Sequence, residues 1–277
     1  MSRVRIPSIA HFLKGHVLST LEIIVLGLIQ GVAEFFPLSS SGHLKLGHML
    51  FGDGLPADYL IFGIVLHLGT LLAMIVGLFA KIKALFQDNR VTLLQIMIAT
   101  LPLLLVVLFL GAIKTVMNSG ICLGLCFMVT GGLLFIGEKM GSSVIRKPKF
   151  WRDSFVIGIF QAMSVLPGLS RLGATVSTAR CLGWSRREAV VFSLLLSLPA
   201  IIGAMIVELC SVLRSPSLQE PSIALYQYLI GFMIAFGVGS VALRGVLKFI
   251  EKRNFIGFGW YCLLLGAIVL LWASMFN

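Results

Sequence analysis

The sequence predicts an all-α polytopic membrane protein that forms a single membrane domain over residues 1–277. Three observations carry this prediction. The chain is 58% hydrophobic and only 12% charged, which is about half the charged fraction of soluble domains. Its mean hydropathy is +1.02. Several continuous apolar segments approach or exceed the roughly 20 residues that a helix needs to cross a membrane, whereas a β-barrel needs short alternating strands.

Eight apolar segments account for the expected helices, and two of them differ from the rest. They cover residues 17–36, 59–80, 91–113, 120–137, 154–166, 189–210, 225–247 and 255–275. The first runs directly into PLSSSGH and the short fifth runs into PGLSRLGAT. Proline and glycine interrupt helices, and irregular backbone is tolerated at membrane depth only where protein or water surrounds it. We therefore expect about six full transmembrane helices plus two re-entrant helix–loop hairpins.

An internal repeat is the next feature of the chain. Pro37 and Pro167 of the two proline motifs are 130 residues apart, and so are Phe62 and Phe192 of two similar apolar segments. A shared offset between two pairs of regions indicates a duplication. The repeats cover approximately residues 17–113 and 154–247, here called the two predicted repeats.

Charge gives the expected orientation of the chain. The net charge of +11 comes largely from short loops between apolar segments, at 81–90, 139–152, 180–187 and 244–253. The positive-inside rule places such loops in the cytoplasm, so this charge indicates membrane topology rather than nucleic-acid binding. The two predicted repeats then have inverted topologies, and their hairpins enter from opposite faces and meet near the midplane.

The first hairpin contains an acidic residue where lipid would otherwise surround the chain. Gln30 and Glu34 are four residues apart and share one face of a helix. A carboxylate inside a membrane segment indicates a functional site, the alternative being a structural ion pair with Arg or Lys. The second hairpin, described below, has the residues of a phosphate-binding loop, and Glu34 would repel a phosphate group bound there. We therefore expect a divalent cation, Mg²⁺ or Ca²⁺, with Glu34 and Gln30 as its protein ligands.

The stretch SSSGH in the same hairpin supplies candidate reactive groups. Ser40 lies three residues before His43, so the imidazole could reach the Ser40 hydroxyl, and either residue could attack phosphorus. For Ser39 and Ser41 we favour hydrogen bonds to the backbone of the turn, while Ser39 is kept as a candidate substrate-binding residue. We interpret His67, in the segment 59–80, as structural or interfacial.

The second hairpin supplies a cation. Arg171 lies in a loop of small residues just before a potential helix start, and an Arg side chain binds phosphate bidentately. Gly168 and Gly173 permit close approach of the backbone, and Ser170 and Thr175 can donate hydrogen bonds to phosphate oxygens. These are the predicted phosphate-binding residues. The alternative is that Arg171 only pairs with Glu34.

The two motifs also resemble those of a known family. QGVAEFFPLSSSGHL and LPGLSRLGAT are similar to the two motifs of the undecaprenyl-pyrophosphate phosphatases, the bacitracin-resistance proteins, and the similarity extends over most of the chain after about residue 20. The resemblance implies hydrolysis of undecaprenyl diphosphate in the bacterial plasma membrane, on its extracytoplasmic side, for cell-wall synthesis. It places Glu34 and Gln30 in the acidic, metal-binding motif, Ser40 or His43 as nucleophile or base, and Arg171 as the phosphate clamp.

Two residues depart from the family pattern. Gln30 stands where many members have Glu, which predicts weaker metal binding. Leu172 stands where a Ser is usual, which removes a hydroxyl group beside Arg171. A flippase for the lipid monophosphate is therefore the alternative function, and a structural membrane protein without chemistry is a third. The expected partners are undecaprenyl diphosphate and membrane lipid, and the sequence does not decide whether the chain forms a homodimer.

Overall fold

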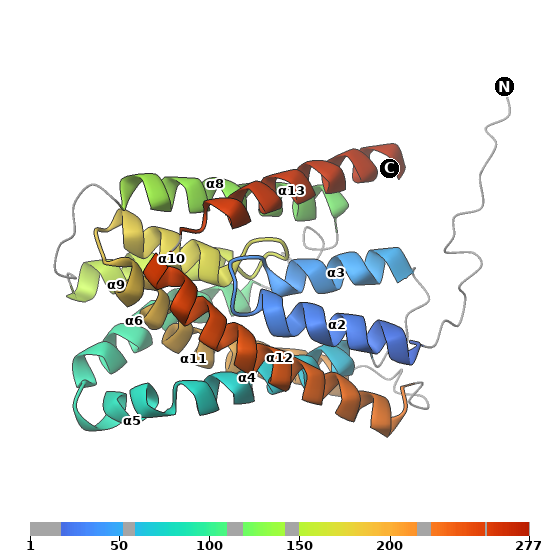
Figure 1. Cartoon of the computed structure of the whole chain (residues 1–277), viewed down its shortest axis with the longest axis horizontal. Helices are drawn as coiled ribbons and strands as arrows, with labels where there is room; N and C mark the ends of the chain where they lie inside the picture. The colour runs from blue at the N-terminus through green and yellow to red at the C-terminus, as the bar shows by residue number, and fades with distance from the viewer. Residues whose placement is uncertain are drawn as a thin grey trace, which may run out of the picture.

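The computed structural model describes residues 18–51, 59–109, 119–141, 150–214, 223–252 and 254–276 (Figure 1). Its regular structure in these ranges is helical throughout. The helices are α2 (Thr20–Ala33), α3 (Ser40–Phe51), α4 (Tyr59–Gly77), α5 (Phe79–Gln87), α6 (Arg90–Leu108), α8 (Gly120–Met140), α9 (Phe150–Met163), α10 (Arg171–Cys181), α11 (Arg186–Leu213), α12 (Leu225–Lys252) and α13 (Ile256–Phe276). Most of the predicted basic loop at 139–152 lies outside the described residues.

Six of these helices are long and apolar enough to cross a membrane. They are α4, α6, α8, α11, α12 and α13. This confirms the prediction of a multi-pass, all-α membrane protein. The apolar segment at 59–80 ends earlier than expected, because the chain turns at Leu78 and continues as the separate helix α5.

Four short helices form two pairs. Helices α2 and α9 have 14 residues each, α3 has 12 and α10 has 11. All are shorter than the roughly 20 residues that a span requires. In each pair a proline-containing loop joins the helices, so the breaks lie where the two sequence motifs predicted them. The re-entrant path and the inverted repeats stay predictions.

Local capping explains where several helices begin. The Ser19 side chain accepts a hydrogen bond from the backbone N–H of Glu22, whose carboxylate accepts one from Ser19 N, and this capping box starts α2. Ser185 and Glu188 start α11 in the same way. Such boxes satisfy backbone donors that a helix leaves unpaired at its first turn.

Helices α12 and α13 pack on different parts of the protein, on either side of the α2–α3 pair. Helix α12 packs on α2 and α4, whereas α13 packs on α8. The two helices are consecutive in the chain and diverge from their connection, with α2 and α3 between them (Figure 1). Phe35, in the loop between α2 and α3, and Leu172, in the first turn of α10, both belong to the largest buried hydrophobic cluster, which anchors the two short-helix pairs to the core.

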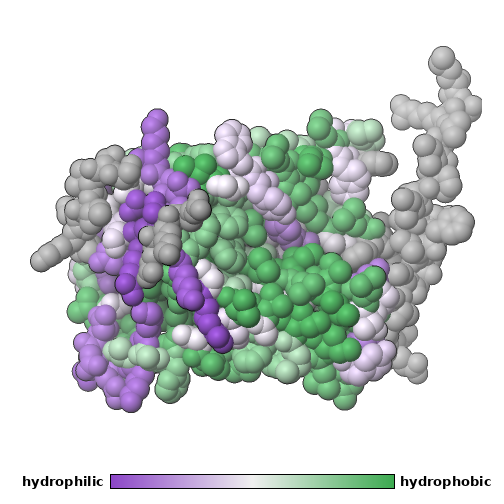
Figure 2. All heavy atoms as spheres, viewed as in Figure 1, coloured by the Kyte–Doolittle hydropathy of each residue, from purple (hydrophilic) through white to green (hydrophobic). Residues whose placement is uncertain are grey.

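Basic side chains gather at one end of the molecule. Helices α5 and α9 and the C-terminal end of α12 lie at the left end in Figure 1 and contribute Lys81, Lys83, Arg152 and Lys248. The visible surface at this end is mainly hydrophilic, whereas much of the surface beside it is hydrophobic (Figure 2). This distribution is typical of a protein whose middle lies in lipid.

Candidate active site

The loops of the two short-helix pairs meet inside the protein. The Ser39 hydroxyl oxygen accepts hydrogen bonds from the backbone N–H of Gly168 at 3.1 Å and of Gly42 at 3.3 Å. Gly168 has φ +94°, a conformation that glycine adopts without strain. A Cβ atom on Gly42 would lie 2.7 Å from Gly168 N, so only glycine permits this approach. Ser39 therefore bonds to backbone, as favoured from the sequence, and it joins the two loops.

Two helix N-termini begin at this junction. Helix α3 starts at Ser40 and α10 starts at Arg171. Within the described residues, the backbone N–H groups of Ser40, Ser41, Arg171 and Leu172 donate no hydrogen bond. Unpaired N–H groups and the positive end of the helix dipole attract anions. The junction thus offers two adjacent sets of donors to one anionic group.

The Glu34 carboxylate lies at the centre of this junction. One of its oxygens accepts a charged hydrogen bond from Arg171, and the other accepts from the Ser40 hydroxyl at 2.6 Å and from the Gln30 amide at 3.1 Å. The Glu34 side chain is 2% exposed and the Arg171 side chain is 21% exposed. The ion pair is therefore nearly closed on the Glu34 side and open on the Arg171 side, where a ligand can reach the guanidinium group.

Gln30 connects the carboxylate to α4. Its side-chain amide nitrogen also lies 3.3 Å from the Thr70 hydroxyl, and its carbonyl oxygen Oε1 is buried without a hydrogen-bond partner among the described residues. That oxygen and Glu34 are the two predicted metal ligands. In the described part of the chain, no three His, Cys, Asp or Glu side chains are grouped to hold a metal ion. A divalent cation here would need phosphate oxygens of a substrate to complete its ligands.

His43 makes contacts that the sequence did not predict. Its Nδ1 lies 2.9 Å from the Ser39 carbonyl oxygen, and its Nε2 lies 2.7 Å from the Tyr261 hydroxyl. Since a carbonyl oxygen only accepts, Nδ1 carries the proton in the neutral ring and Nε2 accepts from Tyr261. The two rings are stacked with centroids 5.7 Å apart. The expected contact between Ser40 and His43 is absent, because the Ser40 hydroxyl turns to Glu34 instead.

His67 lies beside Glu34, a contact that the sequence did not predict. Its Nδ1 lies 2.8 Å from the Gly63 carbonyl oxygen, which leaves Nε2 directed to the site, 3.9 Å from a Glu34 oxygen. The motif HLGT places His67 and Thr70 almost one helical turn apart, so both reach the Gln30–Glu34 face of α2. The three-residue spacing of His67 and Thr70 was the feature of the sequence from which this contact could have been predicted.

The other predicted phosphate-binding side chains stabilise the start of α10. Ser170 is its N-cap, and its hydroxyl oxygen accepts from the Gly173 N–H at 3.1 Å. The Thr175 hydroxyl donates to the Arg171 carbonyl oxygen at 2.8 Å. Thr130 of α8 adds a support missed from the sequence, because its hydroxyl donates to Gly168 O and accepts from Ser170 N, both at 2.9 Å. Phosphate contacts by Ser170, Gly173 and Thr175 stay predictions.

Leu172, which stands where the family usually has Ser, has its side chain outside the group of polar side chains around Glu34. Its side chain is 4% exposed and belongs to the main hydrophobic cluster with Val176 and Phe35. Position 172 therefore contributes its backbone N–H to the junction and its side chain to the core. The missing serine hydroxyl does not remove a group from beside Glu34.

Comparison with known proteins gives consistent results. The family model for the bacitracin resistance protein BacA matches residues 23–268. An undecaprenyl-diphosphatase of Protochlamydia amoebophila is 40% identical over 254 residues, which are 92% of this chain and 98% of that protein. Proteins of the same name from Methanococcus vannielii and Rhodopirellula baltica are 33% and 35% identical, each over 91% of this chain and over 100% and 97% of their own lengths.

Proposed function

Because the chain belongs to the BacA family of bacitracin resistance proteins, we propose that it hydrolyses undecaprenyl diphosphate to undecaprenyl phosphate and inorganic phosphate. This reaction recycles the lipid carrier of cell-wall synthesis. One observation carries the proposal for the site: Glu34 joins Arg171 and the Ser40 hydroxyl at the junction of two helix N-termini. A cation, a nucleophile with an adjacent base and free amide donors are the groups that phosphoryl transfer requires.

Substrate binding uses the positive groups of the junction. The terminal phosphate of the diphosphate takes the exposed side of the Arg171 guanidinium and the free N–H groups at the starts of α3 and α10. Once phosphate shares Arg171, the Glu34 carboxylate loses part of its counter-charge. It then becomes a better proton acceptor for the hydroxyl already bonded to it.

Ser40 is the nucleophile in this proposal. Its hydroxyl proton passes to Glu34, its oxygen bonds to the terminal phosphorus, and the bond from that phosphorus to the bridging oxygen breaks. The electron pair of the broken bond leaves on undecaprenyl phosphate. Glu34 passes that proton to the departing undecaprenyl phosphate and is a free carboxylate again. Water then attacks the phosphoserine: Glu34 takes the water proton, the water oxygen bonds to phosphorus, and the bond from phosphorus to the Ser40 oxygen breaks. Glu34 returns the proton to the Ser40 oxygen, and inorganic phosphate is released. What supports Ser40 over His43 is that both ring nitrogens of His43 have other partners.

A divalent cation, Mg²⁺ or Ca²⁺, remains part of the proposal. Glu34 and Gln30 Oε1 are the side chains that would hold it, together with oxygens of the diphosphate. When bound, the ion would offset negative charge on the phosphates. The buried Gln30 oxygen, which has no partner in the described residues, supports this assignment.

The site faces the extracytoplasmic side of the bacterial plasma membrane in this proposal. The basic end of the molecule, formed by α5, α9 and the end of α12, is the cytoplasmic end by the positive-inside rule. Membrane lipid surrounds the spans. A homodimer also stays a proposal without a described contact to support it.

Phosphate release from a C55 diphosphate in detergent tests the proposed function. The purified protein should release inorganic phosphate, and Arg171→Ala and Glu34→Ala should abolish the release. A flippase for undecaprenyl phosphate would release none, and the names of the relatives do not favour that alternative. Absence of release by the wild-type protein, or full activity of both variants, would refute the proposal.

A further inference from the structure

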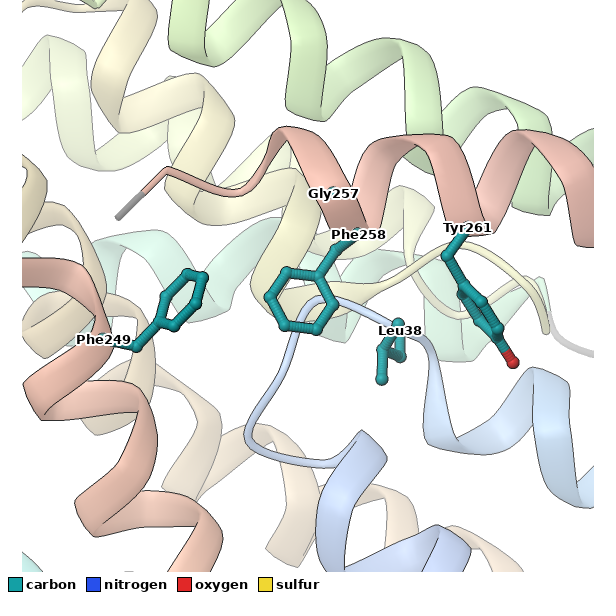
Figure 3. A pocket seen from close by; sticks show the side chains of 5 residues that line it. All are labelled: Leu38, Phe249, Gly257, Phe258 and Tyr261. Atoms are coloured by element: carbon teal, nitrogen blue, oxygen red, sulfur yellow. The ribbon is translucent and has the colours of Figure 1, made fainter. Parts of the chain in front are cut away.

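An apolar groove lies directly beside the first hairpin loop. It has a volume of about 420 Å³ and is lined by Leu38, Phe249, Gly257, Phe258 and Tyr261. Its residues come from the loop between α2 and α3, from the end of α12 and from the start of α13 (Figure 3). Small-molecule sites in proteins have volumes in this range and are lined mainly by hydrophobic and aromatic side chains. The groove exists because α12 and α13 pack on different helices and diverge.

The groove is continuous with the proposed reaction site. Leu38 directly precedes Ser39, which joins the two hairpin loops, and Ser40, the proposed nucleophile. Tyr261 lines the groove with its ring, while its hydroxyl lies 2.7 Å from His43 Nε2. In Figure 3 this hydroxyl points away from Phe249 and Phe258 and toward α3. Tyr261 therefore stands between an apolar space and the polar cluster.

We infer that this groove binds the isoprene units of the lipid that are nearest to the diphosphate. The inference rests on the proposed function and assigns the apolar half of the same substrate. A diphosphate at the start of α3 has a polyprenyl chain attached to it, and that chain needs an apolar path out of the protein. Leu38 and the Tyr261 ring begin such a path beside the reacting group, and it continues along Phe258, Gly257 and Phe249. Tyr261 is 43% exposed and Gly257 is also exposed, so the groove is open.

Gly257 provides a sharp test of the groove. A Cβ atom built on Gly257 meets no other atom within 4 Å, so a larger side chain there enters open space. Gly257 lies in the first turn of α13, where Leu has a better helix propensity than Gly. Gly257→Leu should therefore fold normally and partly fill the groove. Gly237→Leu in α12 is the matched control, because its Cβ is equally free and Gly237 does not line the groove.

Of the two glycine variants, only Gly257→Leu is expected to lose activity on the long-chain substrate. Gly257→Leu should lower kcat/KM for a C55 diphosphate by about tenfold, which is the low end of the 10–200-fold effect of one methylene in an apolar pocket, because this groove is open. Activity on methyl diphosphate, which has no isoprene unit, should stay within about twofold of wild type, and Gly237→Leu should match wild type on both substrates. If the wild-type enzyme releases phosphate while Gly257→Leu and Gly237→Leu behave alike, the groove inference is wrong and the proposed function stands.

A binding experiment separates the groove from catalysis. A polyprenyl diphosphate with a photoreactive group on its first isoprene unit is crosslinked to the Ser40→Ala protein. Labelling of peptides containing Leu38 or Phe258, reduced in a Gly257→Leu background, supports the inference even if the wild type releases no phosphate. Equal labelling by a photoreactive phospholipid would show that ordinary membrane lipid occupies the groove and would overturn it, as would labelling only elsewhere.

Discussion

Replacing Glu34 by Gln tests the arrangement at the centre of the site. The Ser40 hydroxyl donates to a Glu34 oxygen at 2.6 Å, so Glu34 is the group placed to accept its proton. General-base catalysis contributes about 10²–10⁴-fold to rates. Glu34→Gln keeps the size of the side chain and removes the base, and kcat should fall by about that factor. His43→Gln, which leaves the Ser40–Glu34 hydrogen bond intact, should lower kcat much less.

The same substitution also affects stability, because Glu34 pairs with Arg171. The Glu34 side chain is 2% exposed, and removing one partner of a buried pair costs about 3–5 kcal/mol. Arg171 retains some access to solvent, which places the expected loss at the lower end of that range. The double variant Glu34→Gln/Arg171→Gln removes both charges and should regain most of the lost stability without regaining activity.

Two measurements separate these effects. Unfolding is followed by tryptophan fluorescence of the detergent-solubilised protein, and phosphate release from C55 diphosphate is normalised to the folded fraction. The reasoning is refuted if folded Glu34→Gln keeps a rate within tenfold of wild type. It is equally refuted if His43→Gln loses as much activity as Glu34→Gln.

Three further predictions concern single features of the site. Tyr261→Phe removes the hydroxyl that bonds His43 Nε2 but leaves Ser40 and Glu34 in contact, so kcat and the melting temperature should change little; a loss of kcat as large as that of Glu34→Gln would contradict the assigned roles of Ser40 and Glu34. Leu172→Ser restores the serine usual in the family but buries a hydroxyl in the core, so the melting temperature should fall, by an amount equivalent to about 2–5 kcal/mol, without a gain in kcat; higher activity would place position 172 in the site. Gln30→Glu supplies a second carboxylate, so activity lost in EDTA should return at lower Mg²⁺ or Ca²⁺ concentrations than in wild type; activity that survives EDTA would remove the cation from the proposal.

Hydropathy was sufficient to predict the spans. The six long helices lie where continuous apolar segments were found, because only helices satisfy every backbone hydrogen bond in lipid. The helix breaks were also predictable, since Pro37 and Pro167 with their neighbouring glycines and serines interrupt both short pairs. Helix α5 was missed because Lys81 and Lys83 led most of its residues to be assigned to a basic loop at 81–90.

The partners within the site were harder to predict than its members. Glu34, Ser40 and Arg171 were chosen for their chemistry, and the structure brings them into contact. Sequence spacing suggested Ser40 with His43, three residues apart, but the pairing depends on how the loop enters α3. With Ser39 at φ +66°, the imidazole turns back to the Ser39 carbonyl oxygen. Tyr261, 218 residues from His43, lies in a segment whose only local signal is hydrophobicity.

The balance of charge at the junction explains why this site needs more than Arg171. Without substrate, one carboxylate faces one guanidinium group, and Gln30 adds hydrogen bonds but no charge. A bound diphosphate brings at least two negative charges into a nearly closed space, where uncompensated charge is costly. The unpaired amides of α3 and α10 contribute only partial charges, each helix end being equivalent to about half a unit. We therefore expect a divalent cation that arrives with the diphosphate to offset the remaining charge, and a loss of activity in EDTA that Mg²⁺ or Ca²⁺ restores would support this.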